Sequence, residues 1–325
     1  MKKNLTFEEE KRKEFLYVLF NALFVCTCIV FVLNFLGEAL ADKIYAVMSP
    51  NSSDLGDNLL RAFILAAALV GPFAIYAKKS DISFSNMFIP KKKSPLFFVF
   101  GTLCVVGISV PTVVLSDKLF GLLGKFGYVL HEYLPYDFDS LPSNLVSMIF
   151  VSLLSAASGE IVFRGIITER FRRANTGLGL LLAAVIAMGF SGSLVKMPYI
   201  LISGIILSWL YMKTSSLYVT FTAALVRDLA IYSLYLYGES LAPYMTVICI
   251  ACLAVAVISG VILVLRYGIR TVYPAPRDDD DEYLRLSAKE SVKGLFTSFA
   301  FWIFFFGSIF TILFFYLSNP MIVGP

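Results

Sequence analysis

The chain has 325 residues and a formal net charge of +4, and 58% of its residues are hydrophobic while only 15% are charged. With a mean hydropathy of +0.79 it is too apolar for one water-soluble core, so the composition predicts an all-α polytopic membrane protein. The positive charge comes from basic loop segments, which favour contact with anionic lipid in the bilayer. It gives no reason to expect nucleic acid as a partner.

Apolar runs of about spanning length predict eight or nine transmembrane helices, the sixth of them short. Most of the Lys and Arg residues collect in alternate connecting segments, which places the N-terminus in the cytoplasm. No small-residue cleavage site follows the first run, so we interpret it as a retained span. The expected location is a cell membrane, that of a bacterium. The runs lie at about 15–36, 60–77, 96–116, 143–163, 177–195, 197–212, 216–236, 243–265 and 295–317.

Three regions follow from these runs. Residues 1–142 form a three-helix membrane region behind a charged cytoplasmic lead-in at 1–14, and residues 143–236 form the core. Residues 237–325 add C-terminal helices around an acidic cytoplasmic loop at about 266–294. Asp81–Lys93 places apolar residues beside a basic cluster and is expected to rest on the cytoplasmic leaflet.

The sequence contains no pattern for a metal, a cofactor or a disulfide. All five cysteines fall inside apolar runs, where they act as small hydrophobic residues. The run Asp278–Asp281 lacks regular oxygen-ligand spacing and is interpreted as a solvated linker. Asn51 heads a glycosylation-type triplet, to which we give little weight because such triplets are common by chance. His131 is the only histidine, and as a loop residue beside Tyr and Glu it is interpreted as hydrogen-bonded surface.

The core is organised around Ser155–Arg170, where Glu160 and Arg164 interrupt an otherwise apolar helix. Four residues apart, they share one helical face within pairing distance. A carboxylate at membrane depth is costly unless it is neutralised or paired, so a functional site is the default interpretation. The alternative is a structural pair that fixes this helix to its neighbours. Arg227 and Asp228 are the only other charges predicted at this depth.

These residues and their order resemble the CAAX protease and bacteriocin-processing (CPBP, or Abi) family of intramembrane proteases. That family shows Glu-Glu-x-x-x-Arg followed by Gly, then Phe-x-x-x-His, then His-x-x-x-Asn or Asp. In this chain the first motif becomes Gly159-Glu160-Ile-Val-Phe-Arg164-Gly, so its first Glu is missing. The segment Gly204–Leu217 is similar to the glycine-containing span and basic turn that precede the last motif. That motif then falls on Ala224 and Asp228, with alanine at the histidine position.

Counting on from Glu160 places the family's middle histidine at Ser191 or Gly192. If Phe190 is the Phe of that motif, the position is Leu194. None of these residues is histidine. The resemblance implies that the first Glu and the middle His activate water while the last His and the Asn or Asp stabilise an oxyanion. Base, base partner and one donor are therefore missing together. Glu160 and Asp228 supply too few ligands for a transition metal.

We therefore expect a catalytically impaired pseudoprotease scaffold that binds or regulates a membrane or cell-envelope partner. Charge pairs through Glu160, Arg164, Arg227 and Asp228 are expected to lock the fourth and seventh spans together. Gly159 is expected to widen the cavity, and the small residues Gly189–Ser193 to form a groove for a partner helix. The alternatives are an active endopeptidase with an unusual site and, because of the intramembrane charges, a transporter or channel.

Overall fold

In the computed structural model the fold is described for residues 17–48, 54–80, 94–126, 129–130, 140–191, 193–269, 287–313 and 317–318. Several sequence predictions concern residues outside these ranges. They are the lead-in 1–14, Asn51, the segment Asp81–Lys93, His131, Gly192 and the Asp run 278–281.

The described residues are almost entirely helical, which confirms the predicted all-α class, and each of the nine predicted apolar runs overlaps a helix. The only strands among them, β1 (Val129–Leu130) and β2 (Leu317–Ser318), pair antiparallel. The helices are η1 (Val18–Ala22), α2 (Leu23–Met48), α3 (Asp54–Lys79), α4 (Pro95–Gly121), η3 (Leu122–Phe126), α5 (Leu141–Gly159), η4 (Glu160–Thr168), α6 (Glu169–Ala174), α7 (Thr176–Phe190), α8 (Lys196–Thr214), α9 (Leu217–Leu241), η5 (Ala242–Tyr244), α10 (Met245–Tyr267), α11 (Ala288–Thr297) and α12 (Phe299–Thr311).

Within the described residues, five segments are long and apolar enough to cross a membrane, or six if α11 and α12, bent by 73°, form one span. This count is lower than the eight or nine predicted spans for three reasons. The helices α9 and α10 are counted as one segment of 51 residues, α7 has only 15 residues, and α8 carries Lys196 and Lys213 at its ends. Because several of its helices are long and apolar enough to cross a membrane, the chain is a multi-pass membrane protein.

Helix boundaries follow local capping chemistry. Asn175 accepts a hydrogen bond from the backbone N–H of Leu178 and so caps α7, immediately after α6 ends at Ala174. Ser287 and Glu290 form a reciprocal capping box at the start of α11. At the end of α8, Ser215 adopts a left-handed conformation with φ of 49°.

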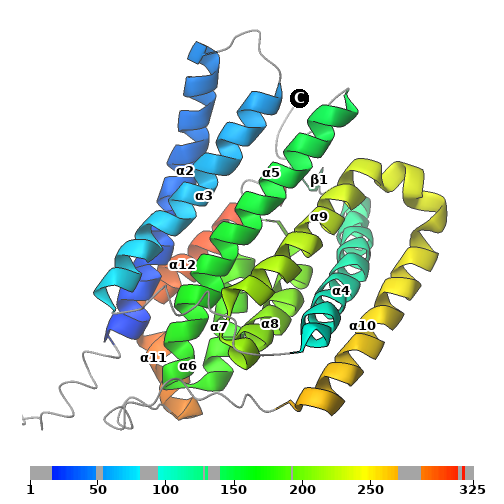
Figure 1. Cartoon of the computed structure of the whole chain (residues 1–325). Coiled ribbons are helices and arrows are strands. Elements are labelled where there is room, and N and C mark those ends of the chain that lie inside the picture. Colours follow the sequence, from blue (N-terminus) through cyan, green and yellow to red (C-terminus); the bar gives the residue numbers. More distant parts are fainter. Residues whose placement is uncertain are drawn as a thin grey trace, which may run out of the picture.

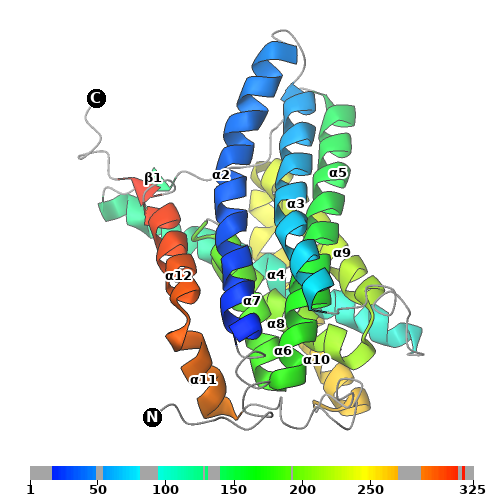
Figure 2. The same cartoon turned by 90° about the vertical axis from the view of Figure 1, so that its left-hand side faces the viewer.

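The helices are arranged around α5 and α9, which pack against each other (Figure 1). On one side α3 packs on α5 and α2 packs on α3, while on the other α4 contacts both α8 and α9. The helices α7 and α8 pack against each other. The helix α12 lies against α2 and α7 (Figure 2). This packing surrounds the segment that carries Glu160 with helices on several sides.

The outermost helix, α10, is held mainly by α4 at a glycine contact (Figure 1). A Cβ added at Gly107 would lie 2.6 Å from the Cys252 carbonyl oxygen and 2.9 Å from the Ala256 Cβ. Because helices approach this closely only where side chains are small, the contact depends on the missing Cβ. Much of the rest of α10 exposes large apolar side chains, as expected for a helix that faces lipid.

Replacing Gly107 with leucine is therefore expected to push α10 away from α4. A cysteine pair can report this, because a Cβ at Gly260 would lie 3.7 Å from the Cys104 Sγ. In a Gly260→Cys background we expect an oxidative crosslink to Cys104 that disappears when Gly107→Leu is added. The matched control is Gly121→Leu on the same helix, where nothing lies within 4 Å. Crosslinking that survives Gly107→Leu would contradict the expected displacement.

Candidate functional site

The first charge pair lies where the α-helix widens into a π-helix. The helix α5 continues into η4, a nine-residue π-helical segment that begins at Glu160. Arg164 Nη1 donates to Glu160 Oε1 at 2.9 Å, and the two side chains are only 4% and 3% exposed. This confirms the pair predicted from the four-residue spacing. Nothing in the sequence predicts the π-helical turn, a rare geometry that is frequent at functional sites.

The second charge pair lies on α9 and joins two consecutive residues. Arg227 Nη2 lies 2.7 Å from Asp228 Oδ1, and Arg227 Nε donates to the same oxygen at 2.8 Å. These side chains are 12% and 14% exposed. Asp228 therefore reaches its nearest cation without leaving its own helix.

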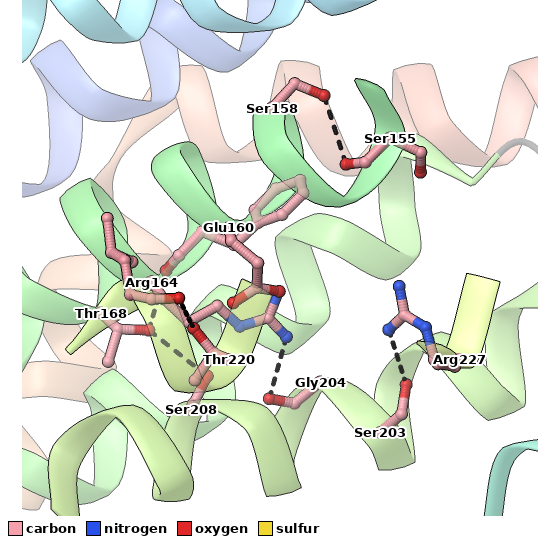
Figure 3. Close-up of polar contacts among 12 residues, drawn as sticks. Ser155, Ser158, Glu160, Arg164, Thr168, Ser203, Gly204, Ser208, Thr220 and Arg227 are labelled. Atoms are coloured by element: carbon pink, nitrogen blue, oxygen red, sulfur yellow. Dashed lines mark hydrogen bonds and ion pairs between the residues drawn. The ribbon is translucent and has the colours of Figure 1, made fainter. Parts of the chain in front are cut away.

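The two pairs are joined through α8, not directly. The expectation that ion pairs link the fourth and seventh spans is wrong, since among the described residues no hydrogen bond or ion pair runs from one pair to the other. Arg164 Nη2 instead donates to the Gly204 carbonyl at 3.2 Å, and Arg227 Nη1 donates to Ser203 Oγ at 3.1 Å (Figure 3). Each arginine binds one oxygen of its own carboxylate and donates a further hydrogen bond to one of two consecutive small residues of α8.

A cavity of about 350 Å³ brings most of the predicted site residues together. Glu160, Arg164, Arg227 and Asp228 all line it, and the remaining wall is largely apolar. Gly159 and Ser191 line it as well. These six residues therefore share one cavity.

Two further predicted positions differ from this pattern. Ala224 is not among the lining residues, and it is fully buried in an apolar cluster with Phe97, Ala156 and Leu207. Gly192 lies outside the described residues.

A Cβ added at Gly159 would be 3.7 Å from the Phe163 ring, an ordinary contact. A side chain could therefore be accommodated there, so the glycine leaves space in the cavity wall.

Some polar atoms at the cavity have no hydrogen-bond partner. Glu160 Oε2, Asp228 Oδ2 and Arg164 Nε are buried and unpartnered, and so is Asn34 Oδ1 on α2. Buried polar groups are normally satisfied, so such atoms require an explanation. Three of these four atoms are hydrogen-bond acceptors.

The small residues of α7 contact another part of the same chain. A Cβ at Gly189 would collide with the Phe304 ring and would lie 2.9 Å from Ser308 Oγ, both on α12. Phe190 also packs on Phe304, with ring centroids 5.6 Å apart. At Gly189 the predicted groove is therefore filled by α12, and among the described small residues of this stretch Ser191 lines the cavity.

A second buried polar cluster, which sequence reasoning missed, lies one to two turns beyond Arg164. The two carboxylate oxygens of Glu169 are engaged by Arg172 Nη2, at 2.9 and 2.8 Å, and Oε2 also by the Tyr211 hydroxyl at 2.9 Å. Arg172 continues to Ser215 Oγ at 3.1 Å. The available signal was the basic Lys-Thr-Ser-Ser turn that closes α8.

Among the described residues, no group of three or more His, Cys, Asp or Glu side chains could hold a metal ion.

Comparison with known proteins gives one match. Residues 141–230 match the family model described as Type II CAAX prenyl endopeptidase Rce1-like. The match begins at the first residue of α5 and ends two residues beyond Asp228, so it contains both charge pairs and all of α8. This confirms, for that stretch, the resemblance to the CAAX protease and bacteriocin-processing family. No curated protein and no solved structure matches the chain.

Proposed function

We propose that this protein is a pseudoprotease scaffold whose CAAX-protease-like core binds or regulates a membrane or cell-envelope partner without cutting it. One observation carries the proposal. The described lining of the cavity contains no histidine and no cysteine, and each of its two carboxylates is paired with its own arginine. In this proposal the chain lies in a bacterial plasma membrane with its N-terminus in the cytoplasm.

The chemistry of peptide hydrolysis supports this interpretation. A general base must be free to take a proton from water, and an oxyanion needs preorganised donors. Removing one such donor typically costs about a hundred- to a thousandfold in rate. Here the positions that the resemblance assigns to the base and to one donor hold Gly159 and Ala224. An ionised Asp228 accepts hydrogen bonds and cannot donate one to an oxyanion.

The form of the cavity supports a binding role. Its volume of about 350 Å³ lies within the usual range for ligand pockets, and its mixture of apolar wall and a few polar groups is typical of them. Buried charges that no longer serve catalysis can be retained because removing one partner alone is strongly destabilising. The cavity can therefore remain intact after catalysis is lost.

The experiment is crosslinking followed by affinity purification from native membranes. We expect a stoichiometric membrane partner that is lost when Gly159→Leu fills the cavity, since this substitution adds volume without removing a charge. The matched control is Gly71→Leu on α3, where nothing lies within 4 Å of an added Cβ. A partner that both variants recover equally would contradict binding at the cavity.

One observation favours a second candidate, an active intramembrane endopeptidase. Glu160 Oε2 has no hydrogen-bond partner and could act as a lone base. Purified protein incubated with prenylated or leader peptides distinguishes the two candidates. The scaffold proposal expects no cleavage, whereas cleavage that disappears in Glu160→Gln would establish the endopeptidase.

A further inference from the structure

The unpartnered atoms of the cavity define the chemistry of what it would bind. Glu160 Oε2 and Asp228 Oδ2 come from two different helices, line the same cavity and are buried without a partner. The Glu160 side chain is only 3% exposed, so solvent at the protein surface does not satisfy this oxygen. Asn34 Oδ1 on α2 adds a third unpartnered acceptor to the lining. The cavity therefore presents acceptors from three helices.

Most donor nitrogens of the charged groups at the site already have a partner. The terminal nitrogens of Arg164 donate to Glu160 and Gly204, and Arg227 is engaged by Asp228 and Ser203. Only Arg164 Nε remains unpartnered. An occupant that donates several hydrogen bonds fits this inventory. A primary ammonium has three donors and no acceptor, and its hydrogen bonds to carboxylates are charge-assisted and strong.

The depth of the cavity distinguishes two sources of such an ammonium. Asp228 lies eleven residues from the start of α9 at Leu217, or about 16 Å along the helix. Because the hydrocarbon core is about 30 Å thick, this position is close to its middle. The amine of a phospholipid lies at the interface, whereas a lysine of a transmembrane segment can lie at any depth. A peptide is therefore the better match.

We propose that the cavity binds the ammonium group of a lysine carried by the transmembrane segment of a partner, held by Glu160 Oε2 and Asp228 Oδ2. This inference rests on the proposed function, which supplies the membrane partner. A lysine at this depth is costly in lipid, so a buried site with two carboxylate acceptors gives it a specific reason to associate.

The test uses transmembrane peptides in phosphatidylcholine nanodiscs that contain the full chain. Three Leu/Ala peptides differ only at the central residue, which is lysine, leucine or Nε-trimethyl-lysine. The trimethylated residue keeps the charge and removes every N–H donor. We expect the lysine peptide to bind at least about tenfold more tightly than either of the others. Equal affinity for lysine and leucine, or for lysine and trimethyl-lysine, would overturn the proposal.

Variants assign the effect to the two oxygens. In Glu160→Gln or Asp228→Asn an amide replaces the carboxylate, so the preference for lysine is expected to disappear. The control is Glu169→Gln on α6, because the oxygens of that buried carboxylate already bind Arg172 and Tyr211. This variant should keep the preference. Retention of the preference in both Glu160→Gln and Asp228→Asn would refute the assignment.

A last arm separates the lipid source and the proposed function. If phosphatidylethanolamine in the nanodiscs abolishes the preference for lysine, the occupant is a lipid headgroup and the proposal fails. If a native partner is captured but no lysine preference exists, this inference fails while the scaffold function stands. If the lysine peptide binds but no native partner associates, the scaffold function fails.

Discussion

Replacing Arg164 with alanine is expected to destabilise the folded protein by about 3–5 kcal/mol, because the change leaves a buried carboxylate unpaired. The guanidinium serves two partners, Glu160 Oε1 at 2.9 Å and the Gly204 carbonyl at 3.2 Å. The Glu160 side chain is only 3% exposed and Gly204 is buried, so neither partner can turn to bulk water. The measurement is the free energy of unfolding in mixed detergent micelles.

A double-substitution cycle separates the cost of an orphaned charge from the value of the pair. Glu160→Gln combined with Arg164→Met removes both charges, and we expect this protein to be more stable than Arg164→Ala alone. The control is Arg266→Ala on α10, where the arginine is exposed and its loss should change stability by less than about 0.5 kcal/mol. If Arg164→Ala costs no more than Arg266→Ala, the buried pair does not stabilise the core.

Local patterns in the sequence were sufficient for the helices and for one half of the site. Apolar runs of spanning length predict helices because each run satisfies its own backbone hydrogen bonds, whatever its neighbours are. The same local reasoning predicts the Glu160–Arg164 pair, since a four-residue spacing within one helix fixes the distance.

Contacts between helices could not be predicted in the same way. The sequence indicated that four charges share one depth but not that Ser203 and Gly204 of α8 would connect them. The small residues near Gly189 were expected to form a groove for a partner helix, whereas in the fold α12 of the same chain packs against Gly189. Motif counting also assigned Ala224 to the site, whereas its helical face turns toward the apolar cluster near Phe97. In each case the missing information was the identity of the facing helix.

Gly204 is the position where one added side chain should disturb both packing and the charge pair. A Cβ there would lie 2.9 Å from the Ala184 Cβ on α7 and 3.4 Å from Arg164 Nη2. Gly204→Val is expected to separate α8 from α7 and to cost about 3 kcal/mol in the free energy of unfolding. Gly307→Val on α12 is the matched control, because nothing lies within 4 Å of a Cβ at Gly307.

A compensating substitution tests the cause of this effect. The nearest obstacle to a Cβ at Gly204 is the Cβ of Ala184, and the next is the Ala184 Cα at 3.2 Å. Ala184→Gly is therefore expected to restore part of the stability lost in Gly204→Val, although it would be destabilising by itself as a glycine within a helix. The two changes together are expected to cost about 1 kcal/mol less than the sum of their separate costs. Additive effects would show that the α7–α8 contact does not limit the size of residue 204, and the loss would then have to come from the Arg164 side of the contact.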